Sequence, residues 1–185
     1  MRARLQFLAC ALFATWMAGA QATDRSASLY QLHERLQNQD GKSIDLDVYR
    51  GQRVLVAMFY GSCPATCPLI IDTLRAIERK ADADARGDLR VLLVSFDSDR
   101  DTPAALRELA TTRHIDTARW TLAHADVGAV RRIAAALNVQ YKKLPSGDFS
   151  HSNIISVLDR DGGISLQSAE LGHADPEILR AINAK

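Results

Sequence analysis

Two mostly apolar runs, each eight residues long, are the strongest constraint on the fold of this 185-residue chain. The first, RVLVAMFY, occupies residues 53–60, and the second, LRVLLVSF, occupies residues 89–96. Strands that are apolar almost without interruption are covered on both faces, as in parallel sheets flanked by helices. Between the runs, apolar side chains recur at helical spacing in Ile70, Leu74, Ile77 and Ala81. The pattern predicts a strand–helix–strand unit.

The rest of the chain continues this alternation. Three more helices are predicted where a capping residue or a proline precedes an apolar face, at Thr102-Pro103, at Asp126 and at Asp175-Pro176. Shorter strands are predicted over 43–48, 119–123, 152–159 and 164–168, and a turn at 160–163 joins the last two into a hairpin. This order predicts an α/β fold with a central mixed β-sheet flanked by helices.

The N-terminus resembles a secretory signal. Basic residues at 1–4 precede an apolar run over 5–17, and the small residues Ala20 and Ala22 end the segment. The apolar run is shorter than the roughly 20 residues that span a bilayer. We therefore expect cleavage after Ala22, or alternatively after Ala20. The mature protein would be one exported, periplasmic domain over 23–185 without a transmembrane segment.

Two alternatives to this cleavage are an uncleaved anchor and lipidation at Cys10. If Cys10 leaves with the signal, the mature chain keeps two of its three cysteines. Acidic and basic residues nearly balance, with 23 Lys and Arg against 22 Asp and Glu. We therefore expect no nucleic-acid partner.

The two remaining cysteines, Cys63 and Cys67, lie between the first apolar run and its helix. Sites in α/β sheets form at the carboxyl ends of strands, and a helix N-terminus lowers the pKa of a thiol. Pro64 and Pro68 predict a stiff loop. A disulfide here closes too small a loop to add much stability. Paired thiols in this position either bind a soft metal or exchange with a disulfide.

Histidines are the candidates for a third ligand. A lone histidine is more often a structural or surface residue, which is the interpretation for His33, His114 and His173, while His124 stays undecided. His151 differs, because it lies where a glycine-containing loop meets the strand predicted over 152–159. Its ring is therefore expected to point toward the cysteines.

Three segments in this order resemble the Sco/SenC family. Cys63-Pro64-x-x-Cys67-Pro68 is similar to the family's CPxxCP motif. Residues 96–103, FDSDRDTP, look like its D-P-x-x-D-T-P segment. His151 stands where the family has its copper-binding histidine. The resemblance runs from residue 39 to the C-terminus.

The resemblance implies a thioredoxin-like fold and a role in assembling the copper centre of cytochrome c oxidase. It makes Cys63, Cys67 and His151 the ligands of Cu(I) or Cu(II). The implied partner is the copper-bearing subunit of the oxidase or another periplasmic thiol or copper protein. The family delivers copper or reduces the cysteines of its target, so a metallochaperone role and thiol–disulfide reductase activity both stay open.

Two other interpretations remain. Cys63 and Cys67 alone suit a thiol–disulfide oxidoreductase that delivers no copper. Two cysteines and a histidine with an open position also suit zinc. The acidic residues Asp97, Asp99 and Asp101 are interpreted as turn and cap residues. Asp97 is the one expected to contact the site, because it follows the strand next to the cysteines.

Overall fold

In the computed structural model, residues 28–63 and 66–184 are described. Within these residues, seven strands form one sheet in the order β2-β1-β5-β4-β3-β8-β9, and two form a separate pair, β6-β7. The central strands are β3 (Arg53–Phe59), β4 (Leu89–Ser95) and β5 (Trp120–His124). They run parallel, with Val56 opposite Leu92 and Leu93 opposite Leu122. The two long apolar runs are therefore neighbouring strands, as predicted.

Antiparallel strands extend the sheet on both sides. On one side are β1 (Arg35–Asn38) and β2 (Ser43–Asp45), which form a hairpin next to β5. On the other side are β8 (Ile155–Leu158) and β9 (Ile164–Ser168), with β8 paired to β3. The predicted mixed α/β sheet is confirmed. Short 3-10 helices, η1 (Leu29–Leu32) and η2 (Leu46–Tyr49), flank the first hairpin.

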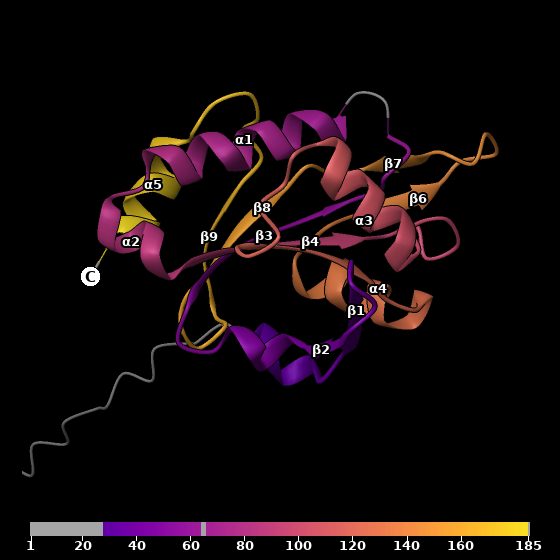
Figure 1. The fold of residues 1–185 in the computed structure, drawn as a ribbon, viewed down its shortest axis with the longest axis horizontal. Helices are drawn as coiled ribbons and strands as arrows, with labels where there is room; N and C mark the ends of the chain where they lie inside the picture. Colours follow the sequence, from indigo (N-terminus) through magenta and orange to yellow (C-terminus); the bar gives the residue numbers. More distant parts are fainter. Residues whose placement is uncertain (1–27, 64–65, 185) are drawn as a thin grey trace, which may run out of the picture.

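Helices cover both faces of the sheet (Figure 1). On one face lie α1 (Thr66–Lys80), α2 (Ala83–Asp88) and α5 (Pro176–Asn183), and α4 (Val127–Ala136) lies on the other. The remaining helix, α3 (Pro103–Thr112), is capped by Thr102, whose hydroxyl accepts from the Ala105 N–H at 3.3 Å. The Asp126 carboxylate caps α4 in the same way.

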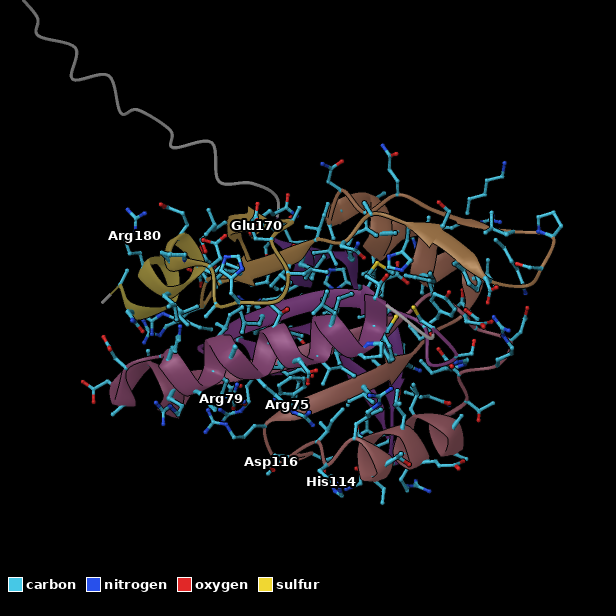
Figure 2. The ribbon with its side chains drawn as sticks, turned by 90° about the horizontal axis from the view of Figure 1, so that it is seen from above. Arg75, Arg79, His114, Asp116, Glu170 and Arg180 are labelled. Carbon is cyan, nitrogen blue, oxygen red and sulfur yellow. The ribbon has the colours of Figure 1, made fainter. Side chains whose placement is uncertain are left out.

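One flank of α1 carries cationic side chains. Figure 2 shows Arg75 and Arg79 on the side of α1 toward the segment that carries His114 and Asp116. Arg75 also donates to the carbonyl oxygen of Arg113 in that segment. The buried side of α1 contributes Ile70, Leu74 and Ile77 to the core, as the helical spacing predicted.

Several parts of the fold differ from the prediction. A strand was expected over 43–48, but β2 ends at Asp45 and the 3-10 helix η2 follows it. A strand was expected over 152–159, but β8 begins only at Ile155, and His151 ends a different strand, β7 (Phe149–His151). β7 pairs with β6 (Tyr141–Lys143) in a hairpin that was not predicted. The short polar strand β6 carries no apolar alternation, and its cross-strand partner alone specifies it. The helix α2 was not predicted either.

Among the described residues, no helix combines the length and apolarity needed to cross a membrane. Residues 1–22, which include Cys10 and both cleavage positions, lie outside the described residues, so what the sequence predicts for them stays a prediction.

Candidate metal centre

The two cysteines lie where β3 passes into α1. Cys63 follows a turn in which its N–H donates to the carbonyl oxygen of Tyr60 at 3.2 Å. Cys67 lies in the first turn of α1. Pro64 and Ala65, between them, are outside the described residues, so the expected stiffness of that stretch stays a prediction. The offset of four residues across the start of a helix brings both sulfurs to one side.

Backbone N–H groups point at both sulfur atoms. Tyr60 N–H donates to Cys67 Sγ at 3.5 Å, and Cys67 N–H donates to Cys63 Sγ at 3.4 Å. Both cysteines are buried, with 9% of Cys63 and 3% of Cys67 exposed. Cys63 therefore has more access to solvent than Cys67.

Burial dominates the protonation of Cys67. The loss of solvation raises the pKa of its thiol above the ordinary value of 9.0, while the bond from Tyr60 acts in the opposite direction. A lowered pKa was expected at the helix N-terminus, and for Cys67 this was wrong. A metal that takes up this sulfur must displace its proton, so binding strengthens as pH rises.

His151 is held in a cluster of aromatic rings. Its ring centroid lies 4.9 Å from that of Phe96 and 6.0 Å from that of Tyr60, which it meets edge-on. Phe149, two residues earlier on β7, packs against both rings, at 5.1 Å from Phe96 and 5.2 Å from Tyr60. Because Tyr60 immediately precedes the cysteine turn, this cluster joins the β6–β7 hairpin to the end of β3.

One hydrogen bond selects the ring nitrogen of His151 that is available to a ligand. His151 Nδ1 lies 3.2 Å from the carbonyl oxygen of Ser152. A carbonyl oxygen accepts only, so Nδ1 carries the proton and Nε2 keeps its lone pair. Such an N–H···O=C bond typically fixes the tautomer of a metal-binding histidine.

The fold brings Cys63, Cys67 and His151 together, although they are far apart in the sequence. One ligand atom from each lies within 4.8 Å of the other two, and no second group of three or more such residues occurs in the described part of the chain. Metal–sulfur and metal–nitrogen bonds are about 2.0–2.3 Å long, so a small inward movement would let all three reach one ion. Two sulfurs and an imidazole suit a soft or borderline metal.

The expectation for Asp97 was wrong, because the acidic residue that contacts the cysteine turn is Asp101. The buried Asp101 carboxylate accepts from Gly61 N–H at 2.7 Å and from Ser95 Oγ at 2.5 Å. Burial raises the pKa of this carboxyl group above its ordinary value. Asp97 instead pairs with Arg100. Asp101 belongs to the D-T-P segment, but the sequence alone indicated only a turn residue there.

The other histidines stay apart from this centre. His33 and His114 have positive φ angles of 50° and 51°, typical of the ends of helices. His124 Nδ1 lies 3.1 Å from the carbonyl oxygen of Asp101. His124 therefore supports the residue that holds the cysteine turn.

Gly61→Ala is expected to destabilise the protein, because a Cβ at this position would lie 2.6 Å from Asp101 Oδ1. Separating the two atoms distorts the turn before Cys63, at about 1–3 kcal/mol of unfolding free energy. Denaturant unfolding measures the loss. Gly87→Ala in α2 is the control, since nothing lies within 4 Å of its Cβ, and it should stabilise the protein by about 0.4–1 kcal/mol. Equal effects at both positions would contradict the close approach of Asp101.

Known proteins resemble this chain in sequence and in fold. The model of the SCO1/SenC family matches residues 22–184. A curated relative from Bacillus subtilis, called SCO1 protein homolog, is 27% identical over 84 residues, which is 45% of this chain and 43% of that protein. The match thus spans less than half of that relative's length.

Solved structures share the fold. ScoI of Bradyrhizobium japonicum, solved with copper bound, has a TM-score of 0.63 at 22% identity, covering 80% of this chain and 94% of its own. A second solved structure is that of BsSco, described as a member of the Sco family of cytochrome c oxidase assembly proteins with a disulfide switch. Its TM-score is 0.66 at 21% identity, and the match covers 84% of this chain and 94% of BsSco. The predicted thioredoxin-like fold, which is that of these Sco structures, is confirmed.

Proposed function

Because this chain belongs to the SCO1/SenC family, we propose that it carries copper through Cys63, Cys67 and His151. Its task would be to deliver this copper to a copper centre of cytochrome c oxidase, or to prepare the cysteines of that centre. The observation that carries the proposal is the convergence of two sulfurs and one imidazole nitrogen within 4.8 Å.

The donor set suits copper as a cargo. Thiolates favour Cu(I), and an imidazole also accommodates Cu(II). Three protein ligands leave a position at which a ligand from a partner can enter, so the ion can pass to the partner without first becoming free. Copper bound to ScoI and the oxidase-assembly role of the family to which BsSco belongs support the same cargo and destination.

The same sulfurs support a second function, reduction of a partner's disulfide. Cys63 is the more exposed of the two. Its thiolate would attack one sulfur of the partner disulfide and release the other as a thiolate. Cys67 would then displace the partner from the mixed disulfide. The partner gains two electrons and becomes a dithiol, while Cys63 and Cys67 are oxidised to a disulfide. Copper binding requires Cys63 and Cys67 as thiols, so the redox state of this pair would control whether the protein binds copper.

The proposed location is the periplasm, with the exported domain beginning after residue 22. The basic, apolar and small-residue pattern of residues 1–22 supports export. The proposed partner is the copper-bearing subunit of cytochrome c oxidase or another periplasmic thiol or copper protein.

His151→Ala separates delivery from reduction. The probe is the soluble copper-bearing domain of the oxidase, offered either with its cysteines reduced and copper-free or with them as a disulfide. For delivery, the copper-loaded wild type transfers metal to the reduced domain, and His151→Ala transfers little. For reduction alone, His151→Ala reduces the disulfide as fast as the wild type, neither protein transfers copper, and Cys63→Ser is inactive. Undiminished copper transfer by His151→Ala would contradict the proposed ligand set.

A further inference from the structure

A groove of about 570 Å³ lies beside the metal centre and is lined in part by Phe96, whose ring packs against that of His151. Its walls are β6, one side of α4 and the β4–α3 connection at residues 96–99. These three segments lie at the same end of the molecule (Figure 1). We call it the β6 groove. Its volume is in the range of pockets that bind ligands.

The wall formed by β6 is a free strand edge. Ser152 N–H bonds to the Gln140 carbonyl, and Leu144 N–H to the Asp148 carbonyl, at 2.9 and 2.7 Å. Hydrogen-bonded pairs alternate along an antiparallel ladder, so the N–H and C=O groups of Tyr141 and Lys143 point away from β7. In the described part of the chain, these groups bond to no other backbone group, and β6 pairs with no other strand. Such an edge can accept an extended peptide.

The opposite wall carries polar atoms without partners. Asp97 Oδ1 and Ser98 Oγ are buried and make no hydrogen bond within the described residues. Asp97 is 1% exposed, and only its other oxygen pairs with Arg100. Buried polar groups are normally satisfied. An occupant that offers N–H donors, as a peptide backbone does, would supply the missing bonds.

The charge of the groove favours an acidic occupant. Its two carboxylates are already paired, Asp97 with Arg100 and Asp99 with Lys143. Two exposed cations, Arg131 on α4 and Lys142 on β6, form no ion pair within the described residues. Apolar surface lies between these charges, including Val127, which is 47% exposed.

We propose that the β6 groove binds an extended acidic segment of a partner polypeptide, which adds as a strand to the free edge of β6. Acidic side chains of the segment contact Arg131 and Lys142, and its backbone N–H groups reach Asp97 Oδ1 and Ser98 Oγ. Tyr141 of β6 lies opposite His151 of β7, so the bound segment is one strand away from a candidate copper ligand. That this partner is also the one that receives copper rests on the proposed function; the groove does not.

The test is a titration of the reduced, copper-free full chain with synthetic peptides, followed by NMR and amide exchange. The probe is acetyl-Thr-Val-Glu-Val-Glu-Val-Thr-amide, and the control peptide has lysine in place of glutamate. Binding should shift and protect the amides of Tyr141 and Lys143. Methylation of alternate peptide nitrogens along the edge that pairs with β6 should abolish binding. Methylation along the other edge removes only the bonds to Asp97 Oδ1 and Ser98 Oγ and should weaken binding less.

Charge reversal tests whether Arg131 and Lys142 recognise the acidic side chains of the peptide. Arg131→Glu combined with Lys142→Glu should weaken binding of the glutamate peptide at least tenfold. Arg79→Glu combined with Lys80→Glu makes the same change of charge at the exposed end of α1 and should leave binding unchanged. Absence of binding at millimolar peptide, preference for the lysine peptide, equal effects of the two double variants, or self-association through the groove would overturn the proposal.

Copper binding is measured separately on the same variants. Arg131→Glu with Lys142→Glu should bind copper as the wild type does, since neither residue is a candidate ligand. Peptide binding without copper binding would contradict the proposed function and leave the docking site standing. Copper binding without peptide binding would overturn the docking site and leave the proposed function standing.

Discussion

Cys67→Ser lowers the affinity of the reduced chain for Cu(I) by more than about 100-fold. Loss of a group that only orients a metal ligand costs about 10- to 100-fold in affinity, and loss of the ligand itself costs more. The substitution is close to isosteric, but an alcohol is a poor ligand for a soft ion. Competition with a chromophoric Cu(I) chelator under anaerobic conditions measures the change.

Ser62→Ala is the matched control for Cys67→Ser. Ser62 lies in the same turn, is exposed and offers no soft ligand. Its Cu(I) affinity should equal that of the wild type, and unfolding curves should show that both variants remain folded. A Cys67→Ser variant whose Cu(I) affinity stayed within tenfold of the wild type would show that this sulfur is not a ligand.

Phe96→Ala is expected to cost about 3–5 kcal/mol of unfolding free energy, as deletion of a buried aromatic ring does. Phe96 is 4% exposed, and its ring packs against those of Tyr60, Tyr141, Phe149 and His151. Because the ring supports His151, the variant should also bind Cu(II) less tightly. Denaturant unfolding and a Cu(II) titration measure the two effects.

Ile182→Ala separates lost stability from a displaced ligand. Ile182 is fully buried in α5, which lies at the opposite end of the sheet from β6 and β7 (Figure 1). It should lose about 2–5 kcal/mol of unfolding free energy and keep the Cu(II) affinity of the wild type. If Phe96→Ala also kept that affinity, the aromatic cluster would not hold His151 in place.

The sequence predicted the framework because its signals are local and strong. Continuous apolar runs identified β3 and β4, and Thr102, Asp126 and Asp175 cap the helices that they were expected to cap. The positions of Cys63 and Cys67 followed from this framework, since a strand that enters a helix must place the intervening residues at the edge of the sheet.

The remaining features depend on contacts between distant segments. β6 contains a tyrosine and two lysines, and only its pairing with β7 makes it a strand. The contact of Asp101 with Gly61 joins residues 40 positions apart. The raised pKa of the Cys67 thiol reflects burial by the whole fold, which outweighs the lowering effect of the hydrogen bond from Tyr60 N–H. Periodicity and spacing carry no information about such contacts.

An anaerobic copper titration of the reduced protein tests most directly whether Cys63, Cys67 and His151 bind copper. Absorption spectra are recorded for both oxidation states. The expected result is one copper per chain and an intense thiolate-to-Cu(II) charge-transfer band. In His151→Ala the band should disappear, while Cu(I) still binds to the two cysteines. His173→Ala, which changes an exposed histidine, should keep the band. An undiminished band in His151→Ala would show that His151 is not a copper ligand.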